Sequence, residues 1–136
     1  MVGLDELTIE ISSIGTKRWI KNGRKHRTDG PAVQSITGDK WWYHEGELHR
    51  TDGPAIEIAN GYKYWYQNDK QHRTDGPAVE SSNGDKWWYQ NGKLHRIDGP
   101  AIEYANGNRG WYLDGVEFTE EQFNSPSCRE FTKYLG

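Results

Sequence analysis

The stretch HRTDGPAV at residues 26–33 decides the fold of this chain, because it returns three times. It reads HRTDGPAI at 49–56, HRTDGPAV at 72–79 and HRIDGPAI at 95–102, so the period is 23 residues with no insertion between copies. Self-similarity at a fixed period of this length is the signature of a protein built from stacked structural repeats. The repeat therefore predicts the architecture before any single residue is interpreted.

The same register extends beyond the four copies in both directions. Glycines and cations keep step with it, and so does a ladder of tryptophans. We expect a repeat array over residues 15–117, preceded by a leading strand or cap at 1–14 and followed by a helical cap at 118–136. The tryptophan ladder consists of Trp19, Trp42, Trp65, Trp88 and Trp111.

Composition excludes several classes of protein. The 136 residues carry a net charge of only −3 and include seven Trp and eight Tyr, which excludes a strongly charged disordered chain. The single cysteine, Cys128, excludes a disulfide framework and a cysteine-built zinc site, and it indicates a reducing, cytoplasmic setting. No signal peptide or membrane span is recognisable. The weakly acidic balance disfavours general affinity for nucleic acid.

One unit is expected to form a β-hairpin. The segment AIEIANGYKYWYQ at 55–67 contains two short aromatic and β-branched stretches around Asn60-Gly61, a strong signal for a two-residue turn. That turn would place Ile56 opposite Trp65 and Glu57 opposite Tyr64. The glutamates would then share one face with the variable aromatic residues, and the lysines would share the other face with the tryptophan ladder. A second turn near Glu45-Gly46 and its equivalents leads to the next HRTDGP corner, so each unit adds about two strands, roughly 9–10 Å of sheet.

The two ends of the array depart from the repeat. Residues 4–11 alternate as a leading strand does. Near the other end, Thr119 with Gln122 predicts a capping box, and Ser125 followed by Pro126 predicts a helix start, so we expect a helical turn at 120–124 and a helix at 126–135. The side chains expected to cover the last hairpin are Phe123, Phe131 and Leu135.

The unit at 91–113 resembles the MORN repeat, a 23-residue hairpin unit. The matching positions are Asn91, Gly92, Lys93, His95, Gly107 and the Trp111-Tyr112 pair. The resemblance covers about 100 residues and implies an all-β fold, an elongated, single-layer, twisted antiparallel sheet that serves as a scaffold or docking surface, sometimes on lipid. Where MORN repeats have HGxG this chain has HRTDGPA, a form similar to repeats in phage and large-virus proteins.

The recurring polar residues invite a catalytic interpretation, but their repetition favours a structural one, since an active site is usually single. An aspartate before Gly-Pro satisfies turn amides and pairs with the arginine two residues earlier. Equivalent histidines should lie roughly 9–10 Å apart, too far to share a metal ion. His44 lies outside the period and is expected to be a solvated residue at a strand end, while Cys128 has no histidine near it in sequence. We therefore expect no catalytic residue, no metal site and no cofactor. The residues assigned to the structural repeat are the tryptophan ladder together with His26, Arg27, Asp29, His49, Arg50, Asp52, His72, Arg73, Asp75, His95, Arg96 and Asp98.

The expected function is binding of another macromolecule, most simply a protein. The resemblance to viral repeats implies a more specific function, inhibition of a host defence or nuclease complex, which a viral protein would perform in the host cytoplasm. Two alternatives stay open, a nucleic-acid binder that uses the lysine and tryptophan ladders and a scaffold or lipid-docking protein of the MORN kind. The oligomeric state is open, and open sheet edges permit edge pairing. The residues expected to contact a partner are Trp41, Glu57, Tyr64, Glu80, Trp87, Glu103 and Tyr104.

Overall fold

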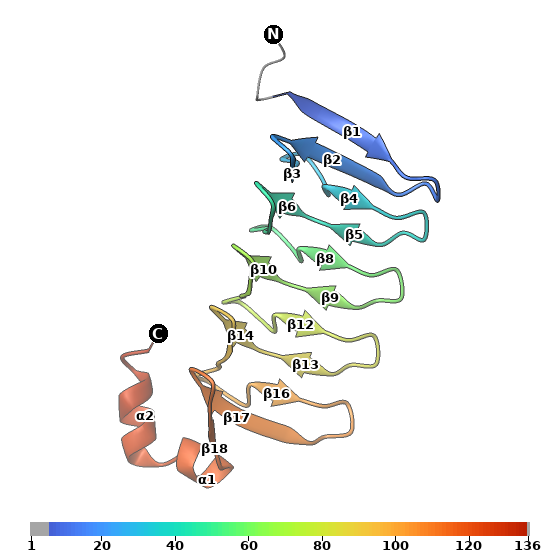
Figure 1. The fold of residues 1–136 in the computed structure, drawn as a ribbon. Helices are drawn as coiled ribbons and strands as arrows, with labels where there is room; N and C mark the ends of the chain where they lie inside the picture. Colours follow the sequence, from blue (N-terminus) through green and yellow to red (C-terminus); the bar gives the residue numbers. More distant parts are fainter. Residues whose placement is uncertain (1–5, 136) are drawn as a thin grey trace. The chain divides into compact units, whose positions relative to one another are not determined.

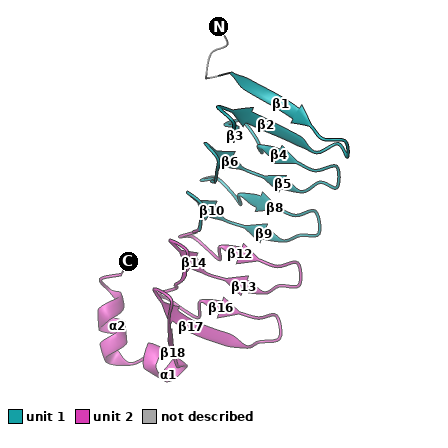
Figure 2. Ribbon diagram, in the orientation of Figure 1, with its two compact units in different colours: residues 1–70 teal, residues 71–136 magenta. Residues whose placement is uncertain are grey.

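A computed structural model describes residues 6–135 as a β-repeat that ends in two short helices (Figure 1). The chain divides into two compact units, residues 1–70 and 71–136 (Figure 2). The predicted all-β repeat of antiparallel hairpins with a helical C-terminal segment is confirmed. The predicted division at residues 14 and 117 stays a prediction.

Unit 1 contains a run of antiparallel strands in the order β1-β2-β4-β5-β8-β9, with β3 paired to β2. A separate hairpin, β6-β7, stands at a corner of the repeat. The strands of this unit are β1 (Leu7–Ile11), β2 (Lys17–Lys21), β3 (Arg24–Lys25), β4 (Val33–Gln34), β5 (Lys40–Trp41), β6 (Tyr43–His44), β7 (Glu47–Leu48), β8 (Ile56–Glu57), β9 (Lys63–Tyr64) and β10 (Tyr66–Gln67), and the unit boundary falls inside β11 (Lys70–Gln71).

Unit 2 repeats the pattern with strands in the order β12-β13-β16-β17-β18 and a corner hairpin, β14-β15. Its elements are β12 (Val79–Glu80), β13 (Lys86–Trp87), β14 (Tyr89–Gln90), β15 (Lys93–Leu94), β16 (Ile102–Glu103), β17 (Arg109–Leu113), β18 (Val116–Phe118), α1 (Glu120–Phe123) and α2 (Pro126–Thr132).

Two kinds of turn alternate along each unit. The corner hairpins close with two-residue turns in which both residues have positive φ, as at Asn91 (51°) and Gly92 (79°), and this confirms the predicted second turn. The other turn has three residues. The Gly61 N–H donates to the Ile58 carbonyl and the Ile58 N–H donates to the Tyr62 carbonyl, both at 2.9 Å, while Gly61 adopts a φ of 105°.

The extra loop residue makes the predicted hairpin register wrong by one position. Ile56 lies opposite Tyr64 and Glu57 opposite Lys63, whereas Trp65 and Tyr64 were the expected partners. A one-residue shift moves a strand's side chains to the other face of the sheet. The variable aromatic residues therefore share a face with the valines and isoleucines, and the glutamates share the opposite face with the lysines.

Small residues form the centre of each repeat. Ala32, Ala55, Ala78 and Ala101 are fully buried, and the Ala55 N–H donates to the Tyr64 carbonyl at 2.8 Å while the Ala55 carbonyl accepts from the Trp42 N–H at 2.7 Å. The backbone groups of one repeat thus bond those of the next. Because Ala32 and Ala55 each bond a strand on either side, the core of unit 1 is a ladder of backbone contacts with few large side chains.

The ends of the chain agree with the sequence in part. Leu7–Ile11 is the expected leading strand, and residues 4 and 5 of that prediction lie outside the described residues. The capping box at Thr119 and the Ser125 cap with Pro126 are confirmed, although α1 ends at Phe123 and α2 at Thr132. Phe123 is buried as predicted and Leu135 is half-buried, whereas Phe131 is 55% exposed and shares a hollow with Phe118 of the last hairpin, so Phe123 is the only one of the three that is enclosed.

Candidate functional site

The HRTDGP corner is organised by its arginine. The Arg50 Nε donates to Asp52 Oδ1 at 2.9 Å, and Nη1 donates to the Pro54 carbonyl at 3.0 Å. The guanidinium lies over the Trp42 ring, with Cζ 3.9 Å from the ring centroid. These contacts satisfy the cation within its own repeat. The same bonds to aspartate and to the proline carbonyl recur at Arg27, Arg73 and Arg96, and the ring contact recurs for Arg27 on Trp19 and Arg96 on Trp88, each at 4.0 Å.

The glycine that follows the aspartate is required by this arginine. A Cβ at Gly53 would lie 2.9 Å from Arg50 Cζ, closer than carbon atoms approach in folded proteins. The glycine therefore leaves room for the guanidinium to fold back over its own turn. The sequence indicated an arginine–aspartate pair but gave no sign that the glycine serves the arginine.

The four histidines of the repeat connect one hairpin to the next. We call them the histidine ladder, which consists of His26, His49, His72 and His95. The Nδ1 of His26 accepts a hydrogen bond from the Glu45 N–H at 2.9 Å, at the two-residue turn of the following repeat. This bond requires a neutral imidazole with its proton on Nε2. Burial lowers the pKa of His26, and the neighbouring His44 and Lys21 lower it further, while Glu45 opposes them. The equivalent bonds are Asn68 N–H to His49 at 3.1 Å, Asn91 N–H to His72 at 3.1 Å and Asp114 N–H to His95 at 3.0 Å.

His44 is exposed, as expected of a solvated residue, but it lies beside the ladder. Its ring centroid is 4.6 Å from that of His26 and 6.1 Å from that of His49. Within residues 6–135, no three side chains of His, Cys, Asp or Glu are grouped in a way that would hold a metal ion. The prediction that the chain has no metal site stays a prediction.

The glutamates predicted to face a partner are held by the corner arginines. Arg50 Nη1 donates to Glu57 Oε1 at 3.2 Å. The corresponding distances are 3.3 Å for Arg73 and Glu80 and 3.1 Å for Arg96 and Glu103. These carboxylates are about one-third exposed, and each shares its arginine with the aspartate of the same corner. The sequence missed this pair because its two residues are seven positions apart and meet only through the folded corner.

The variable aromatic residues lie on the other side of the sheet. In unit 1, Trp41 is opposite Ile56 and Tyr64 packs beside Tyr62, with ring centroids 6.1 Å apart. In unit 2, Trp87 meets the edge of Tyr104 at 5.9 Å. Trp41, Tyr64 and Trp87 are half-buried, and Tyr104 is 41% exposed. We call this side of each unit its aromatic face. Together these faces contain four of the seven predicted contact residues, and the three glutamates lie on the opposite side.

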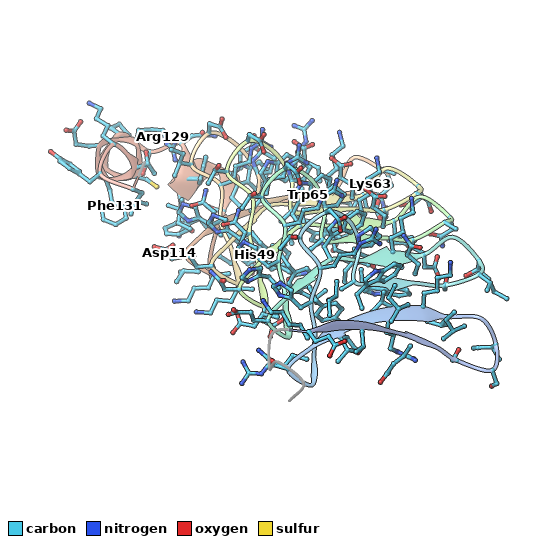
Figure 3. All side chains as sticks on the ribbon, turned by 90° about the horizontal axis from the view of Figure 1, so that it is seen from above. His49, Lys63, Trp65, Asp114, Arg129 and Phe131 are labelled. Carbon is cyan, nitrogen blue, oxygen red and sulfur yellow. The ribbon has the colours of Figure 1, made fainter. Side chains whose placement is uncertain are left out.

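The lysines form a separate row across unit 1. Lys17, Lys40 and Lys63 are exposed, and they alternate with Gln34 and Glu57 in the strand register. Among the ion pairs of residues 6–135, none joins these three lysines to a carboxylate. Figure 3 labels Lys63 of this row and His49 of the ladder, which lie apart. We call these three residues the lysine row.

The cavities lie beside the recurring corners. A groove of about 630 Å³ in unit 1 is lined by residues 27–30 and 49–52 with Trp42 and His44. A similar groove of about 470 Å³ occurs in unit 2. The arginines and aspartates that line them are already bonded to each other, so these grooves repeat the structural contacts of the corner. Cys128 lines a different hollow, near Phe118 and Phe131, with no histidine among its lining residues.

The helical tail is attached through Arg129, which the sequence did not single out. Its Nη1 donates to the Ile97 carbonyl at 2.6 Å and its Nε to the Phe123 carbonyl at 2.9 Å, while the guanidinium lies 4.0 Å from the Phe123 ring centroid. Figure 3 labels Arg129 and Phe131, both on α2. Arg129 bonds α2 to a corner of unit 2, and Phe131 is left exposed.

The described part of the chain contains no helix with the length and apolar character that crossing a bilayer demands. The chain matches no family model and no curated protein.

Proposed function

We propose that this chain is a non-catalytic protein that binds another protein through its aromatic face. The observation that carries the proposal is the set of half-exposed rings on that face, at positions where the repeats differ from each other. Tyr and Trp give a large contact area at low entropic cost and are enriched in protein interfaces. An exposed aromatic patch with a polar rim more often marks a contact site than an accident.

The recurring polar residues support a non-catalytic role. Each ladder histidine uses Nδ1 to accept a backbone N–H, and each corner arginine is occupied by a carboxylate and a carbonyl oxygen. A general base needs a free nitrogen within reach of a substrate proton, and an arginine already paired with a carboxylate attracts a second anion less strongly. Their repetition at each corner is what a structural task requires.

The resemblance of HRTDGPA to repeats of phage and large-virus proteins, and of the hairpin unit to MORN repeats, supports a narrower form. In that form the chain is an inhibitor that covers the working surface of a host defence or nuclease complex. The nucleic-acid alternative is less well supported, because arginines cover the faces of Trp19, Trp42 and Trp88 that bases would stack on. The scaffold or lipid-docking alternative stays a prediction.

The test is whether the chain forms a stoichiometric complex with an identified protein. A tagged chain is used to capture proteins from a lysate of its native cell, the retained protein is identified, and the complex is rebuilt from purified components and measured by light scattering. The Tyr104→Glu variant should weaken the rebuilt complex, and the matched control Tyr134→Glu, at a tyrosine of unit 2 that is 81% exposed, should leave it unchanged. Failure to rebuild any stoichiometric complex, or equal binding by both variants, contradicts the proposal.

A further inference from the structure

The charge available to a partner differs from the charge written in the sequence. Glu57 lies between Lys40 and Lys63 in the strand register, which suggests neutral pairs along the sheet. Its carboxylate is bonded to Arg50 instead, at 3.2 Å. Gln34, which lies between Lys17 and Lys40 in the same row, is uncharged. Among the ion pairs of the described residues, none joins the ammonium groups of the lysine row to a carboxylate, so these groups stay available to a partner.

The lysine row has a regular spacing. Lys17 and Lys40 are separated by one intervening strand, β4, and Lys40 and Lys63 by β8. Two strand spacings place successive lysines about 9–10 Å apart. A polyproline II segment has three residues per turn and a rise of about 3.1 Å, so side chains at every third position share a face about 9 Å apart. An acidic segment in that conformation matches the row one carboxylate to one lysine.

We propose that the lysine row binds an acidic, extended segment of a partner protein, with carboxylates recurring about every 9–10 Å. This inference rests on the proposed function because it supposes a protein partner, and it adds a second contact surface on the side of the sheet opposite the aromatic face. It reverses the sign expected from the sequence, in which Glu57, Glu80 and Glu103 would meet a basic surface. The reversal follows from the arginine bonds that hold those three carboxylates against the corners of the repeat.

A protein segment fits this row better than a nucleic acid does. Binding of single strands combines cations with aromatic rings on which bases stack. The ladder rings beside the row, Trp19 and Trp42, are covered by Arg27 and Arg50. The row is also one residue wide on a chain of net charge −3, which gives little of the broad positive potential that attracts a polyphosphate.

The experiment measures binding of a fluorescent peptide of Glu-Pro-Pro repeats, roughly 12 residues long, by anisotropy at about 50 mM salt. The double variant Lys40→Gln/Lys63→Gln should weaken binding about fivefold or more, because each exposed pair contributes a few tenths of a kcal/mol up to about one. The matched control Arg24→Gln/Lys70→Gln removes two exposed cations from β3 and β11 with the same change in charge, and it should bind like the parent.

Two results overturn the proposal. Equal weakening by both double variants means that only net charge matters, and tighter binding of an oligothymidine of the same length than of the peptide assigns the row to nucleic acid. Failure here is distinguishable from failure of the proposed function. If Lys40→Gln/Lys63→Gln still forms the rebuilt protein complex while Tyr104→Glu does not, the partner uses the aromatic face alone and the lysine row is only a solvated row on the opposite face.

Discussion

The corner arginine and the glycine three positions after it act as one device at the scale of single residues. Arg50 touches an aspartate, a proline carbonyl, a glutamate and the face of Trp42, and the absence of a side chain at Gly53 permits all four contacts. The sequence predicts the aspartate because it lies two residues away in a turn. It does not predict the ring or the glutamate, because those contacts depend on how two hairpins meet.

The pair predicts a coupled effect of substitution. Gly53→Ala should destabilise the protein by about 1–2 kcal/mol, since its Cβ would displace the guanidinium from the Trp42 ring. Arg50→Ala removes the obstructing group, so adding Gly53→Ala to Arg50→Ala should cost much less than adding it to the parent. A double-mutant cycle on urea unfolding measures the difference. If Gly53→Ala costs the same in both backgrounds, the glycine serves the backbone and not the arginine.

The His26 contact predicts a dependence on pH. The unfolded imidazole binds a proton near pH 6.5, and the folded one binds it only at lower pH because its pKa is lowered. Between those two values the unfolded state holds more protons, so stability falls as the solution is acidified. The groups around the ring are His44 from β6, Lys21 from β2, Arg24 from β3 and Glu45 from the turn. Above pH 6.5 both states are neutral and this loss is absent.

Urea unfolding at about pH 7.5 and about pH 5.5 tests this expectation. His26→Asn keeps an acceptor that does not titrate, so its free energy of unfolding should fall less over the interval than that of the parent. Asp29 and Asp75 do not interfere, because their hydrogen bonds to Arg27 and Arg73 hold the pKa of each carboxyl below its usual value. Their contribution is lost only as the pH falls through those lower values. An equal loss of unfolding free energy in parent and variant would show that protonation of His26 does not cause the pH dependence.

At the scale of elements, the hairpins were predictable and their register was not. Asn-Gly occurs in both kinds of turn, as Asn91-Gly92 in a two-residue turn and as Asn60-Gly61 in a three-residue one. The usual arbiter is which register puts apolar residues on the buried face. Here the segment 62–66 reads Tyr-Lys-Tyr-Trp-Tyr, so either register gives an aromatic face. The candidate contact residues were divided between two faces for the same reason.

The attachment of α2 gives a prediction at this scale. Arg129→Ala removes two hydrogen bonds to the Ile97 and Phe123 carbonyls and the contact with the Phe123 ring. Hydrogen exchange in α2 should become at least about tenfold faster, because each lost bond to a charged donor contributes about 1.5–3 kcal/mol. Lys133→Gln breaks only an exposed pair with Glu130 and is the control. Unchanged exchange in Arg129→Ala would mean that apolar contacts alone hold the helix.

At the scale of the whole molecule, the repeat architecture was predictable from the 23-residue period of the sequence. Within each unit, a repeat bonds the next through its backbone and its histidine, so these contacts are local in sequence and the fold of the unit is readable from one repeat. The division into two compact units falls at residues 70 and 71, inside the array, where the 23-residue period shows no interruption. A boundary between like neighbours leaves no compositional mark, unlike a linker rich in proline or glycine.

The last prediction distinguishes a structural role of the four histidines of the repeat from a catalytic or binding role. Replacing them one at a time with alanine should lower stability at every position, because each removes the acceptor of one turn N–H. The loss should be larger for His26 and His95, which are 7% and 4% exposed, than for the half-exposed His49 and His72. Thermal and urea unfolding give the order, and the rebuilt protein complex gives the control, since none of the four should abolish it. If one variant kept its stability and lost the complex or an activity, that repeat would contain a functional site, and the structural role of the histidine ladder would be wrong there.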